Sequence, residues 1–311
     1  MGGGGGGGGG SGIGPTNIEE VRRRAEQIAA QADRNAEINE LLANELAAIN
    51  QRDVEKINSY LDDILAALKE ETDGVERTLF GGSVSKNTYV EGLSDVDALV
   101  VLDRADLGEK SPADMRQEFA RILDRALSGR DVVKVESGAL AVTVRYRDGT
   151  EIQLLPAIQR GERLAISSAD GKEWRPIHPR SFARKLTAVN QAQGGTMIPA
   201  LKVAKTIVGR LPEQERLSGY HMEALAVAAF ETYSGPRSLK AMVAEFFDSA
   251  AKNVLRPIKD VSGQSHHVDE KLGPSDSAAR QALSAALARV AKKMGPASTA
   301  RDWRKLLSSD D

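Results

Sequence analysis

Two aspartates, Asp95 and Asp97, stand at the entrance to an apolar stretch that has the composition of a buried strand, within FGGSVSKNTYVEGLSDVDALVVL at residues 80 to 102. Side chains alternate between the two faces of a strand, so both carboxylates are expected on one face, roughly 7 Å apart along the backbone. Carboxylate oxygens are ligands that Mg²⁺ prefers, together with water and substrate phosphates. The pattern predicts a magnesium site, and two such ions can activate an attacking hydroxyl and stabilise a departing pyrophosphate.

A short glycine and serine segment, Gly81, Gly82 and Ser83, precedes the two aspartates. Glycine lets backbone N–H groups come close to phosphate oxygens, and a serine hydroxyl can bind such an oxygen directly. Alternatively, the glycines form an ordinary turn and the aspartates cap a strand. The combination of both features, with a helical pattern before it and an apolar strand after it, favours a phosphate and metal site.

The elements expected to position this site begin with a polar, alanine-rich region at residues 17 to 72, which has no internal proline. Apolar residues recur at helical spacing in its second half, as at Ile57, Leu61 and Leu68, and predict a helix that ends near Gly74. A second helix is expected from Ser111 to Leu127, with Pro112 in the first turn.

Residues 132 to 158 are rich in β-branched side chains and contain the turn signal Arg147-Asp148-Gly149, which predicts strands joined by a hairpin. Helical patterns return at 197 to 211, at 219 to 233 and near 276 to 294. The fold class is therefore α+β. We expect a glycine-rich tail at residues 1 to 15, a catalytic lobe at 16 to 160 and a helical, nucleotide-binding lobe at 161 to 311.

Composition limits the class of protein. The chain of 311 residues is 41% apolar, which is enough for one large domain or two joined ones. Its net charge of −2 argues against an electrostatic grip on long nucleic acid. The absence of cysteine excludes disulfides and thiolate metal sites. No apolar run approaches the roughly 20 residues that span a bilayer, so a soluble, cytoplasmic protein is expected. The glycine tract is a flexible tail or a cloning remnant.

The stretch GGSVSKNTYVEGLSDVDALVVL resembles nucleotidyltransferases of the DNA polymerase β superfamily, whose pattern is Gly-Gly/Ser, a spacer and then Asp-h-Asp. It is most similar to the branch of oligoadenylate synthases, cyclic GMP-AMP synthase and bacterial cyclic-oligonucleotide synthases. IQLLPAI resembles the strand that carries a third carboxylate in that branch, and LSGYHMEALA resembles a helix that opens with Ser-Tyr. The resemblance spans roughly residues 55 to 295.

The resemblance implies a polymerase-β-like core, in which a small mixed sheet is flanked by helices, with an active cleft between two lobes. It also implies transfer of a nucleotidyl group from an NTP to the hydroxyl of a second nucleotide, dependent on Mg²⁺ or Mn²⁺ held by Asp95 and Asp97. The expected product is a cyclic or short linear oligonucleotide. That product would be a second messenger in bacterial anti-phage defence, read by an effector protein.

One position departs from the family pattern. Gln153 stands where relatives whose strand ends in Leu-Pro-Ala carry an aspartate. An amide can offer a carbonyl oxygen, but it can neither neutralise Mg²⁺ nor act as a base. Glu151 lies two residues earlier, on the same strand face, so it either reaches the metal site or faces solvent beside Arg145. Both Glu151 and Gln153 are therefore candidate catalytic residues.

Further site residues follow from the resemblance. Lys202 and Lys205 match a helix whose lysine contacts the triphosphate, and Lys205 is the better match. Tyr220 matches a tyrosine that stacks on a base. Gly219 stands where relatives often have serine, and Ser218 is one place away. Together with Gly82 and Ser83, these side chains form the expected nucleotide site.

Two other functions stay open. Gln153 is consistent with a catalytically degenerate module that binds nucleotides as a sensor or scaffold. The acceptor of an active enzyme can also be RNA or a protein side chain. The segment His266 to Glu270 is expected to be a polar loop, because its spacing matches no zinc pattern. His178 and His221 are assigned no role.

Overall fold

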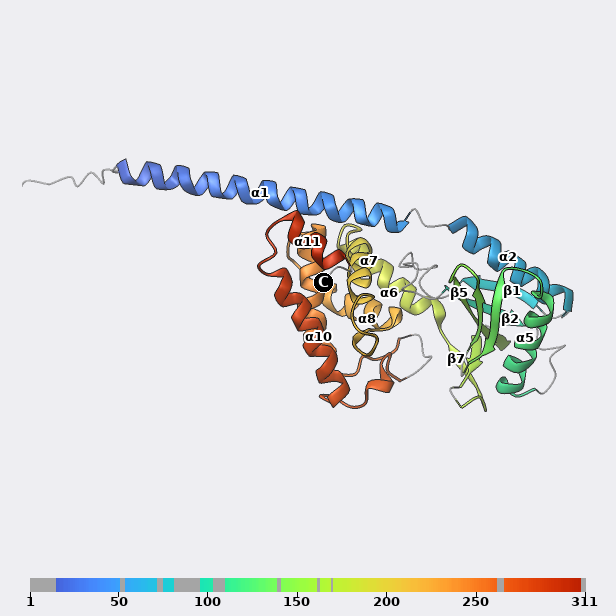
Figure 1. Cartoon of the computed structure of the whole chain (residues 1–311). Coiled ribbons are helices and arrows are strands. Elements are labelled where there is room, and N and C mark those ends of the chain that lie inside the picture. The colour runs from blue at the N-terminus through green and yellow to red at the C-terminus, as the bar shows by residue number, and fades with distance from the viewer. Residues whose placement is uncertain are drawn as a thin grey trace, which may run out of the picture.

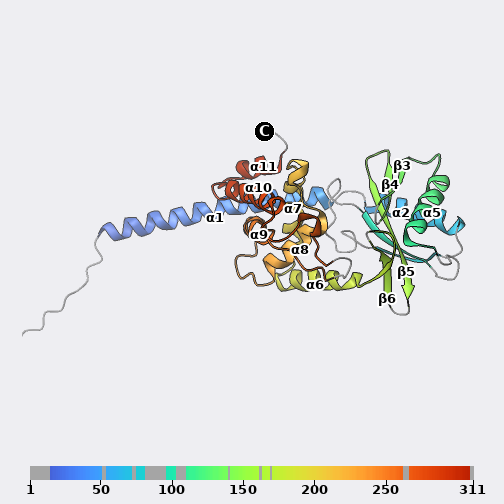
Figure 2. The same ribbon diagram turned by 90° about the horizontal axis from the view of Figure 1, so that it is seen from below.

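The computed structural model describes residues 15–50, 54–71, 75–80, 96–102, 110–138, 141–160, 163–168, 170–261 and 266–308. These residues form a sheet lobe and a helical lobe that lie side by side, with one long helix running along the helical lobe (Figure 1). Turning the molecule by 90° shows the same two lobes (Figure 2). No helix in these ranges is long and apolar enough to cross a membrane.

The sheet lobe is built on a mixed sheet whose described strands number seven. They follow the order β1-β2-β5-β4-β3, and β6 and β7 continue the sheet from the second half of β5. Strands β2 and β5 are parallel, and the other pairs are antiparallel. The strands are β1 (Val75–Phe80), β2 (Val96–Leu102), β3 (Val132–Ser137), β4 (Val142–Tyr146), β5 (Glu151–Arg160), β6 (Arg163–Ser167) and β7 (Trp174–Ile177).

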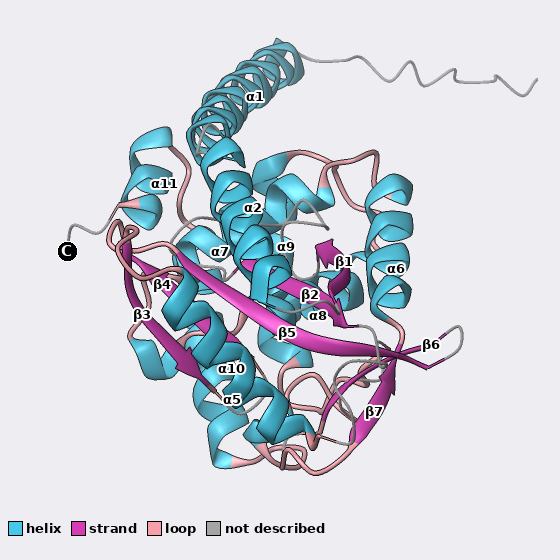
Figure 3. Ribbon diagram, turned by 90° about the vertical axis from the view of Figure 1, so that its right-hand side faces the viewer, coloured by secondary structure: helices cyan, strands magenta, loops and turns pink. Residues whose placement is uncertain are grey.

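Two helices, α2 (Val54–Glu71) and α5 (Pro112–Ala126), cover one face of this sheet (Figure 3). The helical spacing of residues such as Leu61 and the strand alternation of Ile152 and Leu154 bring their side chains into one buried cluster. The expected helix after Ser111 is confirmed, and the Ser111 hydroxyl caps it by accepting a hydrogen bond from the backbone N–H of Asp114.

The expected hairpin at residues 147 to 149 is also confirmed, since it joins β4 to β5. Gly149 has a φ of +87°, a conformation that side chains other than glycine rarely adopt. The turn fixes the register between the two strands, in which Arg145 pairs with Glu151 and Thr143 with Gln153.

The helical lobe follows the sheet and has its own buried cluster. The helices expected at 197 to 211, 219 to 233 and 276 to 294 are present, and others lie before, between and after them. The elements are α6 (Pro179–Ala192), α7 (Met197–Val208), η1 (Glu213–Glu215), α8 (Gly219–Phe230), α9 (Leu239–Asn253), η2 (Glu270–Leu272), α10 (Ala278–Met294) and α11 (Ala300–Leu307).

The long helix α1 (Pro15–Asn50) packs on this helical lobe through its second half. Ile38 and Leu42 are fully buried there, and Asn39 accepts a hydrogen bond from the backbone N–H of Lys240 at 2.9 Å. Its first half extends beyond the lobe and leaves Ile18 two-thirds exposed (Figure 1).

The expected division of the chain therefore needs two changes. A boundary at residue 160 would separate β5 from β6, which pair from Ala157 with Ile166 to Arg160 with Arg163. We place the boundary instead at His178, after the last strand and directly before α6. Helix α1 precedes the sheet in the sequence but packs with the helical lobe, and sequence order alone could not show this.

Candidate active site

The site expected around the aspartates lies at one edge of the sheet, where β1 ends and β2 begins. Phe80, the last residue of β1 and the last before the glycine and serine segment in the sequence, pairs with Ala98 of β2. On the other side of β2, the parallel strand β5 places Gln153 directly opposite Asp97. The topology thus brings together two of the predicted motifs, although 55 residues separate Asp97 from Gln153.

Gln153 faces the helical lobe. Its neighbours along β5, Ile152 and Leu154, point into the cluster under α2 and α5, so alternation turns Gln153 to the opposite face of the sheet. The helical lobe lies beyond that face (Figures 1 and 2). Asp97 is described through its backbone alone, and Asp95, Gly82 and Ser83 lie outside the described residues.

The side chains expected at this edge of the sheet carry oxygen atoms, which are suitable ligands for a hard cation such as Mg²⁺. An amide oxygen from position 153 stands beside the position of an aspartate, and oxygen is the ligand atom that Mg²⁺ prefers. Within the described residues, no three histidine or acidic side chains gather in a way that could hold a metal.

Glu151 is engaged with an arginine on the neighbouring strand. Its carboxylate accepts a hydrogen bond from Arg145 Nε at 2.6 Å, and this contact raises the pKa of the Arg145 guanidinium. Arg145 also lies 3.7 Å from Glu136 on β3, so the three side chains form a charged row across the sheet. Of the two arrangements that the sequence left open, the structure has the one in which Glu151 lies beside Arg145.

Lys205, a predicted triphosphate ligand, lies inside the helical lobe. Its Nζ is 3.1 Å from Glu223 Oε1, and the two side chains are 2% and 1% exposed. The pair joins α7 to α8. A buried charge is costly unless it is paired, so each member of this pair depends on the other.

We expect Lys205→Ala to reduce the free energy of unfolding by about 3 to 5 kcal/mol, because it removes the ammonium that pairs with the buried Glu223 carboxylate at 3.1 Å. Urea denaturation of the wild type and the variant measures this loss. The double variant Lys205→Ala with Glu223→Ala, which removes both charges, should recover part of it. If the double variant were less stable by the sum of both single losses, the two charges would not be coupled.

Lys202, one turn before Lys205, is only partly buried and is the more accessible of the two lysines. Its ammonium donates a hydrogen bond to Asn50 Oδ1 at 2.6 Å. Burial, and then the nearby charge of Lys205, lowers its pKa. An anion bound beside Lys202 would raise this pKa again, because a nearby negative charge stabilises the charged ammonium.

Tyr220 and Ser218 lie at the start of α8. Ser218 is the N-cap of the helix, and its hydroxyl accepts a hydrogen bond from the backbone N–H of His221. Tyr220 is partly exposed, and its hydroxyl donates to Asp260 Oδ1 at 2.7 Å. The ring packs edge-on against Phe182 of α6, with 4.7 Å between the ring centroids. The residue expected to contact a base is thus held at two points.

His221, to which the sequence assigned no role, belongs to a buried polar cluster with Asp269 and Arg280. Its Nε2 lies 3.4 Å from Asp269 Oδ2, and Arg280 Nη1 donates to the same oxygen at 2.5 Å. Burial lowers the pKa of His221 to about 4, although the carboxylate of Asp269 acts in the opposite direction, and Arg280 and Lys271 lower it further. The imidazole is therefore neutral at pH 7.

This cluster predicts a loss of stability in mild acid. Between pH 6.5 and about 4 the unfolded chain binds a proton at His221 that the folded chain does not, so the free energy of unfolding falls as the pH is lowered, by about 3 kcal/mol. Thermal melts across this range measure the effect. His221→Gln should flatten the curve between pH 6.5 and 4. An unaltered curve in His221→Gln would contradict the assignment.

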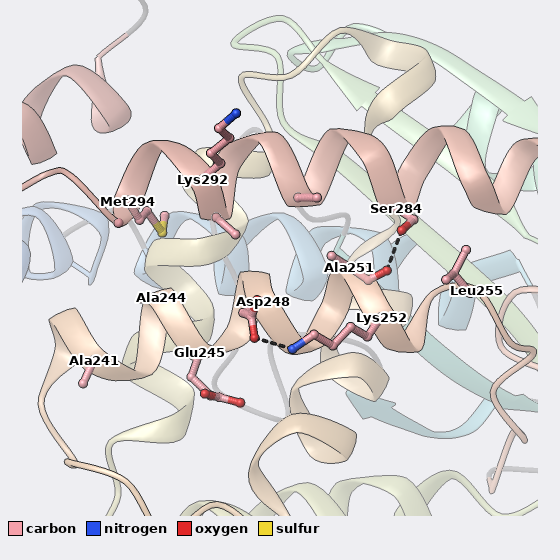
Figure 4. A pocket seen from close by; sticks show the side chains of 13 residues that line it. Ala241, Ala244, Glu245, Asp248, Ala251, Lys252, Leu255, Ser284, Lys292 and Met294 are labelled. Carbon is pink, nitrogen blue, oxygen red and sulfur yellow. Dashed lines mark hydrogen bonds and ion pairs between the residues drawn. The ribbon is translucent and has the colours of Figure 1, made fainter.

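A surface groove of about 810 Å³ lies between α9 and α10, and no predicted site residue lines it (Figure 4). Its charged residues include Asp248 and Lys252, which pair with each other at 2.6 Å, and Ser284 donates to the carbonyl of Ala251. Small side chains such as Ala244 line much of the rest. The groove is separate from the sheet edge that carries the motifs.

The residues that sequence reasoning missed are the partners of the predicted ones. Glu223, Asp260 and Phe182 contact Lys205 or Tyr220, but they come from other elements or from distant turns. Glu223 offered one signal, since an acidic residue among the apolar residues of α8 needs a buried partner.

The fold and the family model define a class of protein: a polymerase-β-like nucleotidyltransferase, with a mixed sheet that includes Asp97 and a helical lobe beyond it. The chain belongs to the family of the Second Messenger Oligonucleotide or Dinucleotide Synthetase domain, whose model matches residues 34–190, half of the chain. It is therefore an enzyme of the kind that makes oligonucleotide second messengers. Among curated proteins, no sequence matches it.

Solved structures with the same fold have low sequence identity to this chain. The CD-NTase CdnG of Bradyrhizobium diazoefficiens in complex with GTP is 17% identical, with a TM-score of 0.62 over 88% of this chain and 96% of that one. CdnC of E. coli MS115-1, in a complex with HORMA-deltaN, is 16% identical, with a TM-score of 0.62 over 83% and 90%. The cyclic AMP-GMP synthase DncV of Vibrio cholerae with nonhydrolyzable GTP is 13% identical, with a TM-score of 0.58 over 94% and 90%. These matches confirm the expected fold.

Proposed function

We propose that this protein joins NTPs into a cyclic or short linear oligonucleotide by nucleotidyl transfer that depends on Mg²⁺ or Mn²⁺. The observation that supports the proposal is the register of β2 and β5, in which Asp97 lies opposite Gln153, inside the region matched by the family model. The product serves as a second messenger in bacterial anti-phage signalling, and an effector protein reads it.

Asp95 and Asp97 would hold the metal ions, with Gln153 contributing an amide oxygen at most. When bound, such ions neutralise phosphate charge and lower the pKa of a coordinated hydroxyl. The chain itself positions the reacting groups, and positioning is the larger part of catalysis in phosphoryl transfer. Gln153 cannot take the proton of the attacking hydroxyl, so general-base action would fall to an aspartate.

The triphosphate would bind to Gly82 and Ser83 at the sheet edge, together with the lysines of α7. Lys202 is less buried than Lys205, and its ammonium reaches the exposed side chain of Asn50, which supports a direct contact with phosphate. The burial of Lys205 and its pairing with Glu223 support a role in which it orders the junction of α7 and α8. Tyr220 would stack on a base beside the N-cap residue Ser218.

The proposal is tested by incubating the protein with α-³²P-labelled NTPs, singly and in pairs, with Mg²⁺ or Mn²⁺, and treating the products with phosphatase. A cyclic product has no terminal phosphate, so phosphatase removes none of its label. A linear product loses its terminal phosphates and keeps only the label in its internal linkages. Label that appears in added RNA or in the protein itself would support a different acceptor. The absence of any labelled product under all these conditions would contradict the proposal.

A second candidate function is a nucleotide-binding sensor or scaffold without turnover. The observation that favours it is the pairing of Glu151 with Arg145, which leaves no described carboxylate on β5 to replace the missing third ligand. Such a protein would bind NTPs in calorimetry and give no product in the labelling experiment. An active enzyme would show both binding and product.

A further inference from the structure

The ring of Tyr220 is fixed by two contacts that come from different parts of the helical lobe. Its hydroxyl donates a hydrogen bond to Asp260 Oδ1 at 2.7 Å, and Phe182 packs edge-on against the ring at an interplanar angle of 71°. A tyrosine side chain has two rotatable bonds before its hydroxyl. A contact at the tip and another at the ring therefore determine where the plane of the ring lies.

Asp260 is held in place by the backbone around it. It is 5% exposed, and its N–H donates to the carbonyl of His266 at 3.1 Å. Lys259 and His267 form an antiparallel bridge, and the N–H of Val268 donates to Ile258 at 2.9 Å. The segments on either side of this bridge thus form a short two-stranded ladder that presents the Asp260 carboxylate to Tyr220.

This ladder is anchored in the core of the lobe by a buried ion pair. Asp269 accepts hydrogen bonds from the N–H of Ile258 at 3.1 Å and from Arg280 Nη1 at 2.5 Å. Arg280 is fully buried and also donates to the carbonyl groups of Val254 and Gly273. A buried, multiply bonded ion pair of this kind leaves the ladder little freedom to move.

We propose that Asp260 is a positioning residue for the nucleobase, acting through the hydroxyl of Tyr220. The inference rests on the proposed function, in which Tyr220 stacks on a base. Stacking requires the ring plane to be set before the nucleotide arrives, because ordering the side chain on binding would reduce the affinity. The buried carboxylate supplies this order, and the charge-assisted hydrogen bond makes it stronger than a neutral contact would.

The inference is tested by calorimetric titration of ATP, GTP and tripolyphosphate into the variants Tyr220→Phe and Asp260→Ala and the double variant. Each single variant should bind the NTPs about five- to tenfold more weakly, which corresponds to the loss of one hydrogen bond. The double variant should be no weaker than the single ones, because both remove the same bond. Tripolyphosphate, which has no base, should bind all three as it binds the wild type.

Asp260→Asn is the matched control, since it keeps an oxygen acceptor and should restore most of the NTP affinity. The inference would be overturned if the double variant lost as much NTP affinity as the two single variants together. It would also be overturned if Asp260→Ala bound NTPs as tightly as the wild type. Tyr220→Ala separates this failure from failure of the proposed base site. If Tyr220→Ala weakens NTP binding while Tyr220→Phe and Asp260→Ala do not, the base site stands and the role of Asp260 is wrong. If Tyr220→Ala binds NTPs like the wild type, stacking on Tyr220 is wrong as well.

Discussion

Asp97→Asn is expected to reduce the rate of oligonucleotide formation on the order of a thousandfold, because the amide keeps the size of the side chain but loses the charge that would hold a metal ion. Asp97 lies in a strand between β1 and β5, so the backbone of the variant should be unaffected. The rate is measured as pyrophosphate released from the NTP pair that gives most product.

The control for this variant is Asp124→Asn on the exposed side of α5, which removes the same charge far from the sheet edge. It should retain the wild-type rate. A melting temperature equal to that of the wild type would show that Asp97→Asn is folded. A folded Asp97→Asn variant with a rate within a few-fold of the wild type would contradict the assignment of the metal site.

Gln153→Asp is expected to increase the rate about tenfold or more. The register places residue 153 opposite Asp97, so the new carboxylate would add one negative charge where metal ions would otherwise be under-neutralised. The matched control is Gln159→Asp, which adds the same charge on the same face of β5, about 20 Å further along the strand. The control should leave the rate unchanged.

The rate of a third variant, Glu151→Gln, decides the role of Glu151. Because its carboxylate pairs with Arg145 at 2.6 Å, we expect Glu151→Gln to change the rate by less than about threefold, the effect of losing a partly exposed ion pair. Loss of activity in Glu151→Gln would show that this carboxylate leaves Arg145 to serve the metal site. A Gln153→Asp variant no faster than Gln159→Asp would show that charge at position 153 does not limit the reaction.

Local patterns in the sequence predict much of this fold because they act over a few residues. Ser111 and Pro112 begin a helix by capping and by a fixed φ, and the Arg147-Asp148-Gly149 turn determines a hairpin. The Asp-Val-Asp pattern likewise indicates an active-site strand without any long-range information. Each of these features depends on residues that are neighbours in the chain.

The contacts that hold the predicted site residues in place could not be read from the sequence. Lys205 and Glu223 are 18 residues apart, and Tyr220 and Asp260 are 40 apart, so their pairing depends on how the helices pack. For the same reason Lys205 was expected at a phosphate, whereas it is buried beside an acid. The packing of α1 on the helical lobe is a third case, because an amphipathic helix does not specify which surface it covers.

The central claim is that this chain is an active enzyme although Gln153 replaces a carboxylate. The most direct test is to incubate the wild-type protein with all four NTPs and Mg²⁺ or Mn²⁺ and to analyse the small products by mass spectrometry. We predict a product of two or three joined nucleotides, with one pyrophosphate released for each linkage formed and no product from Asp97→Asn. NTPs that remain intact in the presence of a protein that binds them would contradict the claim and identify a nucleotide-binding module instead.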